Sequence, residues 1–96
     1  MLVDKDKILT LHPAGKKGVN ISLVIYNLIK SFIVDTLQKK GVVSYKDLDQ
    51  LANEMLGDKI DGSVSWYFVT VKLDLEARNL ICRIEGKSGH QLKLCQ

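Results

Sequence analysis

The sequence predicts an α+β fold, mainly helical, in which three helices precede a C-terminal β-hairpin and follow an extended N-terminal arm. Two segments repeat apolar residues at helical spacing, a third ends in strong helix formers, and the last segment holds two short apolar runs around a glycine-rich turn. A chain of 96 residues has room for one core. We assign residues 1–21 to the arm and a basic glycine loop, and residues 22–96 to the helical domain.

The first helix is expected over residues 22–40. Ser22 is a good N-cap because its side chain can accept a hydrogen bond from a free first-turn amide. Gly41 supplies the left-handed residue that commonly ends a helix. Apolar side chains share one face of this segment at helical spacing: Ile25, Leu28, Ile29, Phe32, Ile33 and Leu37.

A very short strand at residues 42–43 and a second helix at residues 45–56 follow. Ser44 and the acidic residue three positions later, Asp47, fit an N-terminal capping pattern. Gly57 ends the apolar stripe of this helix, which consists of Leu48, Leu51, Ala52, Met55 and Leu56.

The third segment, residues 63–79, admits two interpretations. Residues 69–75 alternate apolar and polar side chains, which is typical of a strand. Val64, Phe68 and Val71 instead fall on one helical stripe, and residues 75–78 are strong helix formers. We therefore expect a helix.

The C-terminal hairpin is expected to pair residues 80–85 with residues 91–95. Placing Ile84 opposite Leu92 keeps apolar residues on one face. That register puts Cys82 and Cys95 on opposite faces of the hairpin, so no disulfide is predicted between them. Both thiols are then expected to be reduced, as in a cytoplasmic protein.

The order helix, short strand, helix, helix, hairpin resembles the winged-helix superfamily, and so does the helix-to-strand stretch at residues 71–83. More narrowly, the segments 11–13, 15–18 and 61–63 resemble a family of small uncharacterised bacterial winged-helix proteins. The resemblance covers residues 22–96 and implies the fold. It brings no activity to this chain.

Catalysis, metal binding and cofactor binding find no support in the motifs. Gly86-Lys87-Ser88 looks like the end of a phosphate-binding loop, but the glycine required five positions earlier is Ile81. The two histidines and two cysteines show none of the close spacings of tetrahedral metal sites. We expect no enzyme, no cofactor and no small-molecule substrate. The net charge of +3 is only mildly basic, and no apolar segment is long enough to span a bilayer or act as a signal peptide.

The outer face of the third helix is the most informative surface. A DNA-reading helix offers polar and basic side chains to base edges, whereas this face is largely apolar. Two interpretations of this apolar face stay open. The arm covers the face, or the face is a protein interface, most simply of a homodimer. Direct base reading is the least favoured. The candidate interface residues are Trp66, Val69, Thr70 and Leu73.

Nucleic acid could instead contact cations of the hairpin turn and of the glycine loop, through phosphates only. The alternative is that these side chains simply form a solvated basic surface. The candidates are Lys16, Lys17, Lys72, Arg83, Lys87, His90 and Lys93. Sequence alone therefore predicts a non-catalytic binding module that acts on nucleic acid through these cations or, alternatively, on a protein through the third helix.

Overall fold

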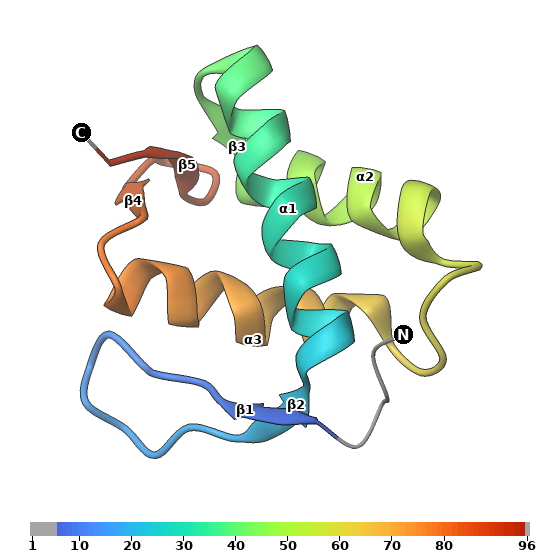
Figure 1. The fold of residues 1–96 in the computed structure, drawn as a ribbon. Helices are drawn as coiled ribbons and strands as arrows, with labels where there is room; N and C mark the ends of the chain where they lie inside the picture. Colours follow the sequence, from blue (N-terminus) through green and yellow to red (C-terminus); the bar gives the residue numbers. More distant parts are fainter. Residues whose placement is uncertain (1–5, 96) are drawn as a thin grey trace.

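The computed structural model describes residues 6–95, and within them an α+β fold of three helices and two small sheets (Figure 1). The elements in chain order are β1 (Lys7–Leu9), β2 (Asn20–Ser22), α1 (Leu23–Lys40), β3 (Val43–Ser44), α2 (Tyr45–Leu56), α3 (Val64–Ala77), β4 (Ile81–Ile84) and β5 (Gln91–Leu94). We refer to residues 6–22 as the arm and to residues 81–94 as the wing. The predicted fold class is confirmed.

Each helix begins at a serine whose side chain caps it. Ser22 Oγ accepts a hydrogen bond from the Ile25 amide at 3.4 Å, as predicted for α1. Ser44 and Ser63 accept bonds at 3.1 Å from the amides of Asp47 and Trp66. Such caps satisfy amide groups that have no partner inside the helix.

The third segment is a helix, so the strand alternative is excluded. It ends at Ala77, two residues earlier than expected. Asn79 adopts a left-handed conformation, with φ of 63°, and the Leu80 amide reaches back to the Leu75 carbonyl at 2.9 Å. Asparagine tolerates this conformation better than most residues, which explains why the chain turns here into the wing.

The register predicted for the C-terminal hairpin is wrong by one residue. β4 pairs with β5 so that Cys82 faces Lys93 and Arg83 faces Leu92. β5 is the central strand of the sheet β3–β5–β4 and is fixed by its pairing with β3. The observed register buries Ile81 rather than the smaller Cys82, and it avoids placing Arg83 opposite Lys93.

This register overturns the prediction that the cysteines stay apart. A shift of one residue moves every side chain of a strand to the other face. Cys82 therefore lies on the same face as Cys95, and a disulfide joins them with their Cα atoms 5.3 Å apart. The expectation of two reduced thiols is corrected accordingly.

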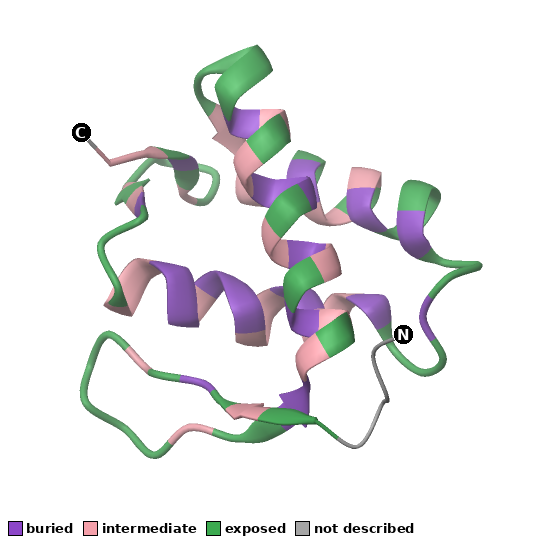
Figure 2. Ribbon diagram, viewed as in Figure 1, coloured by how far each residue is buried: buried purple, intermediate pink, exposed green. Residues whose placement is uncertain are grey.

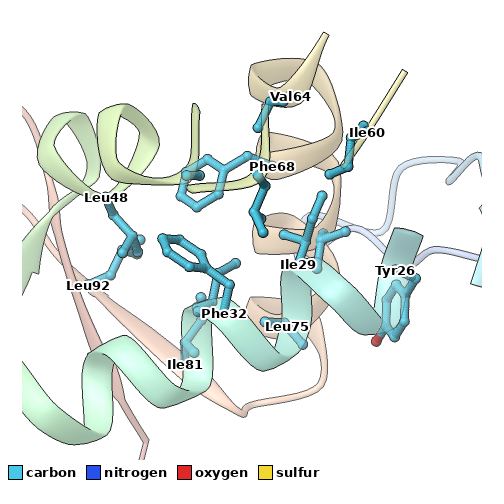
Figure 3. Packing of buried hydrophobic residues seen from close by; sticks show 14 of the residues in the cluster. Tyr26, Ile29, Phe32, Leu48, Ile60, Val64, Phe68, Leu75, Ile81 and Leu92 are labelled. Carbon is cyan, nitrogen blue, oxygen red and sulfur yellow. The ribbon is translucent and has the colours of Figure 1, made fainter. Parts of the chain in front are cut away.

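A single apolar core connects the helices with the wing (Figure 3). Phe68 of α3 lies at its centre, between Ile29 of α1 and Leu48 of α2, and all three are fully buried. Leu92 of the wing and Ile21 of the arm belong to the same core. Both appendages are thus anchored to the helical domain by apolar contact.

The arm is a β-hairpin that lies along the C-terminal half of α3 (Figure 1). β1 and β2 pair antiparallel, with Ile8 opposite Ile21. The connecting loop is mostly exposed, while Thr10 is buried (Figure 2). The expected extended arm is therefore folded back onto the domain.

Candidate binding surfaces

Asp74 of α3 joins the arm to two helices. Its carboxylate is fully buried and accepts hydrogen bonds from the Leu11 amide at 2.8 Å, the Tyr26 hydroxyl at 2.5 Å and Arg78 Nε at 2.8 Å. Burial, followed by the hydrogen bond to Asp74, raises the pKa of Tyr26 to about 12. A buried carboxylate requires such partners because it has lost its hydration. Asp74 thereby fixes where the arm crosses α3.

A second set of contacts closes the arm loop. The Thr10 amide donates to the Val19 carbonyl at 2.9 Å, and the Val19 amide donates to Thr10 Oγ1 at 3.1 Å. Gly18 sits so close to Thr10 that a Cβ atom at Gly18 would come within 1.7 Å of the Thr10 carbonyl oxygen. The loop therefore requires glycine at this position for space.

The predicted interface residues of α3 are only partly covered by the arm. A small cavity of about 110 Å³ separates the two, lined by Leu11 and Val19 of the arm and by Thr70 and Leu73 of α3, among others. Trp66 lies one turn before Thr70, whose hydroxyl donates to the Trp66 carbonyl at 2.9 Å. We call the surface formed by these apolar or partly apolar residues the arm–α3 face; its members are Leu11, Val19, Trp66, Val69, Thr70 and Leu73.

The arm–α3 face keeps a considerable apolar exposure. Trp66 is 47% exposed, Leu11 43% and Val19 39%. Val69, Thr70 and Leu73 of α3 are half-buried. The arm thus covers part of the predicted stripe and adds two apolar side chains of its own to what remains.

Lys72 does not lie where the sequence suggested. Its side chain is almost completely buried, with Nζ 2.9 Å from Glu76 Oε2 and 5.2 Å from the centroid of the Tyr45 ring. The prediction that Lys72 contacts nucleic acid is therefore corrected, because the ammonium group faces the interior. Its long aliphatic stem allows a lysine at the edge of the core to bury its carbons and still reach a carboxylate.

His90 connects the wing to α2 and α3. Its ring lies 4.9 Å from the Tyr45 ring, which in turn lies 5.5 Å from that of Phe68. The Tyr45 amide donates to the His90 carbonyl at 3.0 Å. Burial lowers the pKa of His90, and the nearby charges of Lys72 and Arg83 lower it further. His90 is therefore a packing residue as much as a surface one.

The remaining predicted cations lie at the surface, in two groups. Lys16 and Lys17 are exposed in the arm loop. Lys87 and Lys93 are exposed on the wing. Arg83 is also exposed, and its Nε lies 3.4 Å from Glu85 Oε2. Within residues 6–95 the four lysines form no ion pair. Among the predicted candidates, these four lysines are exposed and available to an anionic partner.

Two clefts flank the start of α2. One, of about 530 Å³, lies against the wing turn and is lined by Ser44, Tyr45, Lys46, Gly86, Ser88, Gly89, His90 and Gln91. The other, of about 660 Å³, is open and contains Asp47 and Glu54 beside Lys40. No group of three or more potential metal ligands occurs in the part of the chain that the structure describes. None of its helices is long and apolar enough to cross a membrane.

The residues that sequence reasoning missed are those with partners distant along the chain. Asp74 and Arg78 pair at the i,i+4 spacing that a helix brings together. The roles of Tyr26 and Leu11 at the same carboxylate had no local signal, since they lie 48 and 63 residues away. One sequence feature pointed to this site: the acidic residue Asp74 lies between the apolar residues Val71 and Leu75 of the predicted helix.

Comparison with known proteins places the chain in a family but brings no function with it. No curated protein and no solved structure matches the sequence. Residues 7–92 match the family described as a family of unknown function, DUF6958. This range contains both strands of the arm, all three helices, β4 and most of the surfaces described above. The protein belongs to the DUF6958 family.

Proposed function

We propose that this protein is a non-catalytic binding module of the winged-helix type that associates with a second copy of itself through the arm–α3 face. The arrangement of three helices with a C-terminal hairpin is compatible with that fold. The observation that carries the proposal is the apolar exposure gathered from two elements, chiefly at Trp66, Leu11 and Val19. Clusters of this composition are typical of protein interfaces.

The character of α3 argues against a groove-reading role. Its one cation, Lys72, is buried against Glu76. The arm also crosses the helix near Leu73 and Asp74, where a DNA duplex would have to approach. A helix without exposed donors of positive charge has little to offer phosphates or base edges.

The test of self-association is the solution mass of the protein from micromolar to millimolar concentration. We expect a reversible dimer, and we expect Trp66→Lys to be monomeric over the same range. Met55→Lys is the matched control, because Met55 is also apolar and exposed but lies on α2. A parent protein that stays monomeric, or a Trp66→Lys variant that still dimerises, would contradict the proposal.

A second candidate function is contact with nucleic acid phosphates, favoured by the unpaired lysines of the wing and the arm loop. Such binding would be weak in sequence preference and would fall steeply with salt. Labelled duplex DNA titrated at low and moderate salt tests it. Lys87→Glu with Lys93→Glu should weaken binding, whereas Lys59→Glu, an exposed charge reversal between α2 and α3, should not. Absence of binding at low salt would end this candidate.

A cytoplasmic location stays part of the proposal, and the Cys82–Cys95 disulfide is the observation that counts against it. Disulfides are most common in oxidising compartments. Counting free thiols by rapid alkylation in intact cells would decide whether the pair is open or closed where the protein works.

A further inference from the structure

The disulfide lies at the open end of the wing, opposite its turn. The pairing of β4 with β5 reaches Ile81 and Leu94, and the Cys95 amide extends the ladder by donating to the Leu80 carbonyl at 3.1 Å. Both cysteines are half-buried. The cross-link therefore closes the hairpin at the end where no turn constrains it.

The amino-acid pattern of the wing is compatible with two registers. The observed register buries Ile81 and pairs Arg83 with Leu92. A register shifted by one residue would place Ile84 opposite Leu92 and turn Cys82 inward. Because that shift moves Cys82 to the other face, only the observed register permits the disulfide.

The strand that a shift would displace is β4. β5 is held on its other side by β3, with Val43 opposite Leu92. β4 is an edge strand that follows α3 through a short turn. In the observed register Arg83 Nη2 lies 3.4 Å from His90 Nδ1, and Ile81 belongs to the core. A displaced β4 would separate Arg83 from His90 and would remove Ile81 from the core.

We propose that Cys82 and Cys95 form a reversible thiol–disulfide site that locks the register of β4 on β5. In the opening reaction, one thiolate of a dithiol reductant attacks a sulfur of the Cys82–Cys95 bond, which breaks as a mixed disulfide forms. The second thiol of the reductant then displaces the remaining cysteine. The products are two cysteine thiols and the oxidised reductant, after transfer of two electrons and two protons.

Amide hydrogen exchange before and after treatment with dithiothreitol tests the lock. We expect the amides of β4 and Cys95 to exchange at least about tenfold faster after reduction, while the Gly41 amide at the end of α1 keeps its protection. The double variant Cys82→Ser with Cys95→Ser should exchange like the reduced protein and should not respond to the reductant. Free thiols in the untreated protein, unchanged exchange in the wing, or equal loosening of wing and α1 would each overturn the proposal.

A charge reversal on β5 tests the second register directly. In the shifted register residue 93 lies opposite Arg83, so Lys93→Glu replaces a repulsion with an attraction. We expect reduced Lys93→Glu to show nuclear Overhauser contacts between residues 83 and 93, and the oxidised variant to keep the contact between residues 82 and 93. Lys87→Glu, an equal charge change in the turn, should leave the register unaltered. If reduced Lys93→Glu keeps the original cross-strand contacts, the cysteines do not control the register.

Discussion

The arm and the wing are both hairpins with an apolar anchor in the same core, but their other attachments differ. The arm is fixed where it crosses α3 by a single buried carboxylate, Asp74, and its loop is closed by hydrogen bonds between Thr10 and Val19. The wing is held by the buried side chain of Leu92, the stacking of His90 on Tyr45 and a disulfide.

The difference matters because polar and apolar attachments respond differently to the loss of one side chain. Removing one partner from a buried polar set leaves the others without compensation, so the loss is steep. Apolar packing is spread over many contacts and depends less on any one side chain, although replacing either cysteine removes the disulfide. We therefore expect that, among the noncovalent attachments, that of the arm is the one that a single substitution weakens most.

The largest effect is expected for Asp74→Ala. The change leaves the Leu11 amide and the buried Tyr26 hydroxyl without their acceptor, and it should lower the free energy of unfolding by about 3–5 kcal/mol. Chemical denaturation measures the loss, and amide exchange should show it concentrated in the arm.

Asp35→Ala is the control, because Asp35 is exposed on α1 and its removal should change stability by no more than about 0.5 kcal/mol. Asp74→Asn keeps an acceptor for the arm and should fall between the two. Equal stability of Asp74→Ala and the control would show that the carboxylate does not hold the arm.

A smaller effect is expected for Gly18→Ala. The added methyl group would collide with the Thr10 carbonyl, so the loop must open at a cost of roughly 1–3 kcal/mol. Thermal unfolding compares it with Lys17→Ala, an exposed neighbour for which little change is expected. A Gly18→Ala protein as stable as Lys17→Ala would mean that the loop adapts without losing its closure.

Alkaline pH should loosen the arm. The pKa of Tyr26 is about 12 in the folded protein and 10.0 in its ordinary state, so the folded protein favours the neutral hydroxyl. Stability is then unaffected below pH 10 and declines as the pH rises from 10 towards 12. Denaturation of Tyr26→Phe over the same range should show less decline; an identical profile would assign the effect to other groups.

Acidic pH should act mainly on the wing, with the smallest effect of the four. The pKa of His90 lies below 6.5 because burial and the charges of Lys72 and Arg83 disfavour the protonated ring. The stability that neutral His90 contributes is therefore complete above pH 6.5 and is lost as the pH falls through its lower, folded-state pKa. Titration of the ring by NMR gives the value directly, and a value above 6.5 would contradict the structure.

Local features of the fold were predictable from the sequence. The caps at Ser22 and Ser44 and the helix ending at Gly41 depend on neighbours within one turn, so a short window of sequence contains the necessary information. The apolar core face of α3, with Phe68 and Val71, followed from helical spacing in the same way.

Features set by distant contacts were not predictable in this way. The hairpin register depends on the packing of Ile81 and on the pairing of β5 with β3, and an error of one residue reversed the conclusion about the cysteines. From the sequence alone, Lys72 is consistent with an exposed residue. Its burial depends on Glu76 and the Tyr45 ring, which lie beside it in the folded chain. Of the candidate surfaces, the apolar face of α3 was anticipated, but the contribution of Leu11 and Val19 to it was not.

The hydrogen bond from Leu11 to Asp74 also determines how the arm meets other chains. The Thr10 amide donates to the Val19 carbonyl, and the Asp6 carbonyl accepts from the Leu23 amide, so residues 6 and 10 bond towards the second half of the hairpin. The alternating amides, including that of Leu11, therefore point to the opposite side, which is the free edge. An open strand edge with apolar residues invites strand addition by another molecule. By engaging the Leu11 amide, Asp74 removes one donor from the end of this edge, and we expect it to disfavour strand addition there as well as to hold the arm in place.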